Sequence, residues 1–125
     1  MTLVLDAGAF IAVERADRMV MALLAREQRA GRLPVTHGGV VGQVWRGDAR
    51  QARVARLLSG SVVVSLDEAL GRAAGDLLAR SGGRDVIDAA IVLLAADGDE
   101  ILTSDAEDLT ALAAASGTQA ELVEV

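Results

Sequence analysis

The strongest constraint on the fold of this chain is a regular alternation between short apolar runs and longer segments with helical periodicity. The short runs, each of strand length, are Thr2–Leu5, Leu33–Val35, Ser61–Ser65, Glu100–Thr103 and Glu121–Val125. Strands separated by helices form parallel sheets, because a parallel pair needs a long crossover connection that is usually helical. The sequence therefore predicts an α/β fold: a central parallel sheet of about five strands, flanked by helices on both faces, with the last run at an edge.

The segments between these runs have helix start and stop signals. The expected helices cover residues 8–15, 17–30, 37–46, 49–58, 66–81, 85–96 and 105–116. Thr36 is the expected N-cap of the third helix, and Ser65 with Glu68 and Ser104 with Glu107 match the capping-box pattern. No linker or internal repeat interrupts the alternation, so we expect one domain over residues 1–125.

Composition narrows the chemistry that the chain can perform. It has 125 residues, of which 52% are hydrophobic, and this excludes a disordered or fibrous protein. It has no Cys, which excludes disulfides and thiolate sites, and no Lys, which excludes Schiff-base chemistry. We expect His37 to be exposed and without a role, and Trp45 to pack in the core or in a dimer interface. Any catalysis should therefore depend mostly on carboxylates.

The sequence indicates neither export nor membrane insertion. Its first residues, MTLVLDAG, reach Asp6 without the basic lead-in of a signal peptide. The longest apolar run, Ala89–Ala96, is far shorter than the ~20 residues of a membrane span. We therefore expect a cytoplasmic protein that does not contact a membrane.

The formal net charge of −6 conceals two unlike halves of the chain. Residues 1–60 hold nine Arg and five acidic residues, whereas residues 61–125 hold three Arg and thirteen acidic residues. Four of the arginines, spaced to form one stripe if they share a helix, are Arg46, Arg50, Arg53 and Arg56. Such a stripe is either a solvated helix face or a row of RNA phosphate contacts, because guanidinium binds phosphate through two parallel hydrogen bonds.

The acidic residues fall where an α/β sheet binds ligands. Asp6 ends the first strand and Asp105 follows the fourth, and the carboxyl ends of parallel strands meet at one edge. Asp85 and Asp88 open a helix, and Asp108 stands three residues after Asp105. Carboxylates that converge need a cation to offset their repulsion, and hard oxygen ligands select Mg²⁺ or Mn²⁺. Helix starts also attract Asp for simpler reasons, so Asp85 could be only an N-cap and Asp108 only a first-turn acid.

Three segments in this order and separation carry a resemblance to a known family. They are LVLDAGAFIAVE, GRDVIDAAIVLLA and ILTSDAEDL, and together they span nearly the whole chain. The sequence resembles PIN domains, in particular the short VapC-type toxins of bacterial toxin–antitoxin pairs. The resemblance implies a parallel sheet between helices, metal-dependent ribonuclease activity, frequent homodimers and inhibition by a cognate antitoxin.

Residue by residue, the resemblance assigns a site. The acids that match the family's catalytic and metal-binding positions are Asp6, Asp88 and Asp105. Thr103 matches a hydroxyl residue that often lines the site. Gln43 stands where the family usually has a Glu, and an amide oxygen can bind a cation but brings no negative charge. Asp85 or Glu14 could supply the missing charge.

The function implied by the resemblance is hydrolysis of RNA phosphodiester bonds with one or two Mg²⁺ or Mn²⁺ ions. Two other classes of function stay open from the sequence. One is a catalytically weak PIN scaffold that acts by binding RNA or an antitoxin, which Gln43 favours. The other is a small phosphohydrolase with Asp6 as nucleophile. The absence of Lys argues against it, and so does Gly8, which stands where a second Asp would be needed.

Overall fold

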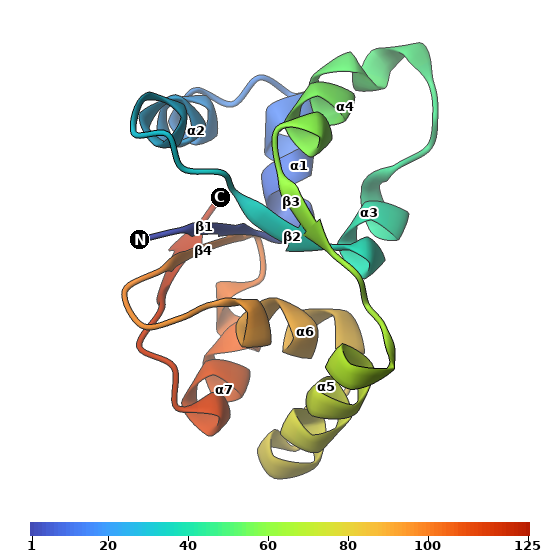
Figure 1. Ribbon diagram of the computed structural model, residues 1–125, viewed down its shortest axis with the longest axis vertical. Coiled ribbons are helices and arrows are strands. Elements are labelled where there is room, and N and C mark those ends of the chain that lie inside the picture. The colour runs from blue at the N-terminus through green and yellow to red at the C-terminus, as the bar shows by residue number, and fades with distance from the viewer.

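The computed structural model describes residues 1–125 and centres on one five-stranded sheet in which every strand pairing is parallel (Figure 1). Its strands are β1 (Leu3–Leu5), β2 (Val35–His37), β3 (Val62–Val64), β4 (Glu100–Thr103) and β5 (Glu121–Glu124). Their spatial order is β3-β2-β1-β4-β5, so β1 lies at the centre and β3 and β5 at the edges. The predicted α/β fold with its five-stranded parallel sheet is confirmed.

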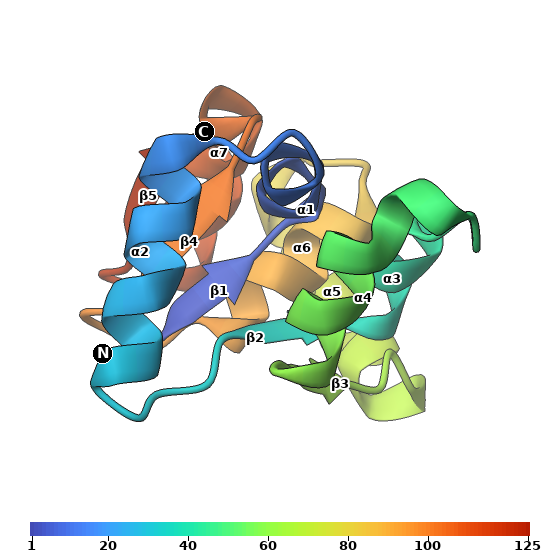
Figure 2. The same ribbon diagram turned by 90° about the horizontal axis from the view of Figure 1, so that it is seen from above.

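Seven helices surround the sheet. They are α1 (Ala7–Glu14), α2 (Arg18–Arg29), α3 (Gly38–Val44), α4 (Ala52–Ser59), α5 (Glu68–Ser81), α6 (Val86–Leu94) and α7 (Ala106–Ser116), with a 3₁₀ turn at Ala49–Gln51. Helices α1, α2 and α4 cover one face of the sheet, and α5, α6 and α7 cover the other (Figures 1 and 2). None of the helices combines the length and apolar character needed to cross a membrane.

The core forms on both faces of β1. All three of its residues are fully buried, as expected for a central strand covered by helices on each side. Val4 pairs with Val35 on one side and with Ile101 on the other. Phe10 of α1 is also fully buried and belongs to the same continuous apolar core. The strand that precedes Asp6 is therefore fully buried between the helices of the two faces.

The second strand begins two residues later than the sequence pattern predicts. Leu33 is 59% exposed and Pro34 has no N–H to donate, so the ladder starts at Val35. Thr36 lies inside the strand, where its hydroxyl donates to the carbonyl of Leu5 at 2.8 Å. The prediction of Thr36 as a helix N-cap is therefore wrong.

Both predicted capping boxes are wrong as well. Asp67 caps α5 instead of Ser65, and its carboxylate accepts from the N–H of Leu70 at 3.0 Å. Asp105 occupies the N-cap position of α7, but its side chain makes no capping hydrogen bond. The N–H of Ala106 donates instead to the Glu124 carboxylate at 3.1 Å. The side chain of Asp105 is thus left available at the edge of the sheet.

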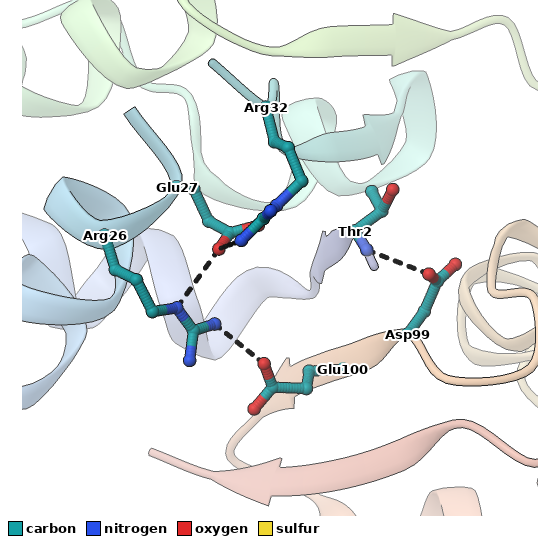
Figure 3. A network of polar contacts seen from close by, with 6 residues as sticks. All are labelled: Thr2, Arg26, Glu27, Arg32, Asp99 and Glu100. Carbon is teal, nitrogen blue, oxygen red and sulfur yellow. Dashed lines mark hydrogen bonds and ion pairs between the residues drawn. The ribbon is translucent and has the colours of Figure 1, made fainter. Parts of the chain in front are cut away.

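The amino-terminal edge of the sheet is held by an ion-pair network (Figure 3). Glu27 of α2 is 1% exposed and accepts two hydrogen bonds from Arg32, at 3.0 and 2.9 Å, and one from Arg26 at 3.1 Å. Arg26 also pairs with Glu100 of β4 at 2.7 Å. These hydrogen bonds lower the pKa of Glu27, those from Arg32 most. Charge at this edge is paired, in contrast to the opposite edge.

Candidate active site

Asp6 is the fixed point of the carboxyl edge of the sheet. Its N–H donates to the carbonyl of Leu102 at 3.0 Å, which continues the pairing of β1 with β4. One carboxylate oxygen accepts from the N–H of Ala7 at 2.8 Å and caps α1, and the other accepts from the Thr103 hydroxyl at 2.8 Å. Burial raises the pKa of Asp6, the two hydrogen bonds act against this rise, and Asp105 and Asp85 add to it.

Thr103 connects two of the predicted site residues. Its buried hydroxyl donates to Asp6 and accepts from the N–H of Asp105 at 3.0 Å. The carboxylate of Asp6 and the backbone of Asp105 are therefore held by one side chain, and the structure places Thr103 beside both of these predicted site residues.

The first turn of α6 brings in two further acids. Asp85 is the N-cap, and its carboxylate accepts from the N–H groups of Ile87 at 2.8 Å and of Asp88 at 3.2 Å. Capping thus accounts for Asp85 by itself, as the simpler interpretation holds. The carboxylate of Asp88, by contrast, is half-buried and accepts no hydrogen bond from any protein group.

The carboxylate of Asp88 has a strongly raised pKa. Its pKa rises from 3.8 to about 7, first because of desolvation and then because of the nearby charges of four other acids. Those acids, in decreasing order of effect, are Asp85, Asp6, Asp105 and Asp108. None of the five forms an ion pair with an Arg, so the negative charge of this cluster is uncompensated within the chain.

We use the name carboxylate cluster for Asp6, Asp85, Asp88, Asp105 and Asp108. Its donor chemistry fits a hard divalent cation, because every donor is an oxygen and the acids destabilise one another. Its side-chain placement does not present a finished site, since no three His, Asp or Glu side chains lie close enough together to hold a metal ion. A cation would have to draw these carboxylates inward.

A concavity of about 960 Å³ lies between α1, α3, the 3₁₀ turn and α4. The four arginines predicted to form one stripe all line it: Arg46, Arg50, Arg53 and Arg56. They do not share a helix, however, because Gly47 adopts a positive φ and only the last two arginines lie on α4. We call this feature the arginine concavity.

Few protein groups occupy the guanidinium donors of the arginine concavity. Arg50 makes an exposed ion pair with Asp48 at 3.4 Å, and Arg46 donates to the carbonyl of Trp45 at 2.7 Å. Arg53 makes one long hydrogen bond, to the carbonyl of Glu14 at 3.5 Å, and the guanidinium of Arg56 makes neither a hydrogen bond nor an ion pair. The donors therefore remain free to bind an anion such as a phosphate.

Gln43 lies in the arginine concavity together with Glu14, and both are accessible to solvent. Gln43 makes no hydrogen bond to any member of the carboxylate cluster. Two acids were expected to replace the charge of the missing Glu. Asp85 raises the pKa of Asp6 and of Asp88, whereas Glu14 lines the arginine concavity. Trp45 is 42% exposed, so of the two places predicted for it the core is wrong and the dimer interface stays a prediction.

The prediction of an exposed His37 is also wrong. The ring is fully buried, its Nδ1 accepts from the N–H of Gly39 at 3.0 Å, and its Nε2 lies 3.1 Å from the carbonyl oxygen of Ile87. The error follows from the misplaced second strand, since His37 is the last residue of β2 and not the first of a helix.

Two other features had no signal in the sequence. Gln51 is buried and its side chain bonds three backbone groups around the arginine concavity. Gly8 approaches Ser104 so closely that a Cβ at position 8 would lie 2.7 Å from the Ser104 nitrogen. Both depend on contacts between segments far apart in the sequence or on loop geometry that periodicity does not encode.

Comparison of the sequence with models of known protein families gave no match, and comparison with curated proteins gave none either.

Proposed function

We propose that this protein is a metal-dependent endoribonuclease of the PIN-domain type, acting as the toxin of a toxin–antitoxin pair. The observation that carries the proposal is the half-buried, unpartnered carboxylate of Asp88, whose pKa of about 7 reflects burial and four neighbouring acids. A protein gains no stability from such an arrangement, and perturbed carboxylates of this kind concentrate at functional sites.

Asp6, Asp88 and Asp105 would hold one or two Mg²⁺ or Mn²⁺ ions, with Asp85 and Asp108 adding negative charge nearby. When bound, the metal would lower the pKa of a water molecule and offset charge on the scissile phosphate. Thr103 would keep Asp6 from rotating, because its hydroxyl occupies one oxygen of that carboxylate at 2.8 Å. Asp88 would lose its proton as the cation enters, since its pKa lies near neutrality without one.

The arginine concavity would hold the RNA backbone beside the cluster. An acidic site repels nucleic acid and needs positive charge nearby to bind it. Helix α1 joins the two features, because Asp6 caps its start and Glu14 lies at its other end, about 12 Å away by the rise of a helix. A short stretch of single-stranded RNA could span that distance.

Cleavage of a transcript pool by the purified protein tests the proposal. We expect cuts that require Mg²⁺ or Mn²⁺, disappear with chelator, and fall by about a hundredfold or more in Asp88→Asn. Asp76→Asn is a matched control, because Asp76 is an exposed acid on α5 outside the cluster and loses the same charge. Growth arrest on expression, relieved by a small neighbouring gene, would support the toxin assignment.

A second candidate function is a PIN scaffold that binds RNA or an antitoxin without efficient cleavage. Two observations favour it: the cluster presents no ready three-ligand site, and an amide, Gln43, stands where a fourth acid is expected. This candidate predicts salt-dependent RNA binding with no metal-dependent cuts in the same assay. Homodimer formation is expected under either function and can be measured by sedimentation.

A further inference from the structure

His37 joins two helices at the carboxyl edge of the sheet. It ends β2, and its Nδ1 accepts a hydrogen bond from the N–H of Gly39, which caps α3. Because Nδ1 is the acceptor there, Nε2 carries the ring proton and donates it to the carbonyl oxygen of Ile87 at 3.1 Å. Both ring nitrogens of a fully buried imidazole are therefore satisfied by backbone groups of different helices.

The bond to Ile87 reaches the turn that carries two acids. Ile87 lies between Asp85 and Asp88, and its own N–H is held by the Asp85 carboxylate at 2.8 Å. The carbonyl of Ile87 is thus held by the His37 ring, and its N–H is held by the Asp85 side chain that caps α6. Movement of this turn would change how far Asp88 stands from Asp6, which ends the neighbouring strand.

The packing around the ring leaves little room for another arrangement. A Cβ at position 39 would lie 2.9 Å from His37 Cε1 and would overlap the side chain of Ile87, so a larger residue there would have to displace one of these two side chains. An apolar side chain at position 37 could fill a similar volume, but it would supply neither of the two directional bonds. The contact between α3 and α6 therefore depends on the two hydrogen bonds of the His37 imidazole and not only on the volume that the ring fills.

We infer that His37 is a positioning residue, which holds the first turn of α6, and with it Asp85 and Asp88, against the end of β2. The consequence for metal binding rests on the proposed function. The placement of the turn itself can be measured in the metal-free protein.

Two substitutions each keep one of the two hydrogen bonds that the His37 ring makes. In His37→Asn the side-chain amide can still accept from Gly39, because it lies where Nδ1 does, but it is too short to reach Ile87. In His37→Gln the amide can reach the position of Nε2 and donate to Ile87, while the cap on Gly39 is lost. Both variants should be less stable than the wild type, since each leaves one buried bond unmade.

The measurements are amide hydrogen exchange at Ile87 and Asp88 without metal, and Mn²⁺ affinity by calorimetry. We expect His37→Asn to lose about tenfold in protection at both amides and about tenfold in Mn²⁺ affinity, as happens when a residue that orients metal ligands is replaced. His37→Gln should keep both quantities within about twofold of the wild type.

Asp99→Asn is a matched control at the opposite edge of the sheet. Asp99 is also a buried side chain that bonds two backbone groups, the N–H of Thr2 at 2.9 Å and that of Ala96 at 2.8 Å. The change should lower stability and leave the exchange of Ile87 and Asp88 and the Mn²⁺ affinity unchanged.

The outcomes distinguish the positioning role from the proposed function. Equal protection of the two amides in His37→Asn and His37→Gln would overturn the positioning role, whatever the metal does. Normal Mn²⁺ affinity in His37→Asn would overturn the consequence of this positioning for metal binding while leaving the ribonuclease intact. Loss of protection at Ile87 and Asp88 in His37→Asn but not in His37→Gln would support the positioning role. If the wild-type protein at the same time binds no Mn²⁺, the proposed function is refuted. If His37→Asn does not fold, a tenfold loss of Mn²⁺ affinity in His37→Gln overturns the inference.

Discussion

Replacing Asp88 by Asn should stabilise the metal-free protein, and the gain should depend on pH. The folded carboxyl has a pKa of about 7, against an ordinary value of 3.8, so the fold is weakened whenever this group is ionised. That difference corresponds to a ceiling of about 4 kcal/mol at about 1.4 kcal/mol per pH unit. Solvent reaches the half-buried side chain and screens it, which reduces the expected gain to about 1–2 kcal/mol.

The sign follows from the direction of the pKa. Because the folded value is raised, the destabilisation builds as the pH rises from the unfolded pKa near 3.8 to the folded pKa of about 7, and it is constant above that. Asp88→Asn should therefore exceed the wild type most at about pH 8 and lose its advantage towards about pH 4. Urea unfolding in chelator at several pH values measures this, with Asp76→Asn as the control. An advantage that is absent at high pH, or equal at all pH values, would refute this reasoning.

Four further changes test other parts of the structure. Glu27→Gln should lower the unfolding free energy by about 2 kcal/mol at neutral pH, because it removes the ion-pair partner of Arg32 and one of the two partners of Arg26. The loss should shrink on acidification through the folded pKa of Glu27, which lies below 4.5, as urea titrations would show. The double change Arg50→Ala and Arg53→Ala should weaken RNA binding for all sequences and reduce the slope of log affinity against log salt concentration by about two. An unchanged slope would show that these side chains are solvated and do not contact RNA phosphates. Gln43→Glu should weaken RNA binding without metal by a few-fold, because it adds a carboxylate to the arginine concavity; tighter Mn²⁺ binding in calorimetry would instead place residue 43 beside the carboxylate cluster. Gly8→Ala should lower stability by about 1–3 kcal/mol in thermal unfolding, since its Cβ meets the backbone of Ser104, and a neutral change would contradict that close approach.

The sheet and the acids around it could be predicted because their signals are local. A buried three-residue strand followed by Asp6 is visible as an apolar run followed by a charge, and the order of such runs fixes the α/β class. Asp85 and Asp88 were visible as acids that open an apolar helix. The same local pattern could not show that Thr103 would bridge Asp6 to Asp105, because that contact depends on the pairing of β1 with β4.

The errors concentrate where local signals compete. Leu33 and Pro34 look like the start of a strand, yet Pro cannot donate to the ladder, and the pairing with β3 selects residues 35–37 instead. That shift of two residues moved His37 from an exposed helix start to a buried strand end. The arginine spacing correctly indicated a shared surface but not its shape, because Gly47 interrupts the helix.

The strand order sets when the carboxylate cluster can exist. Asp6 and Thr103 are 97 residues apart, and β1 lies between β2 and β4, so the centre of the sheet cannot close until the chain is available up to Thr103. Closing so long a loop is slow and occurs late in folding, because the chain loses conformational entropy before the contact between β1 and β4 provides any stabilisation. On the ribosome, the arginine-rich first half would emerge well before the acidic second half. We therefore expect a nascent or truncated chain to expose cationic surface without an assembled carboxylate edge, so that any activity of that edge begins only after β4 has been synthesised.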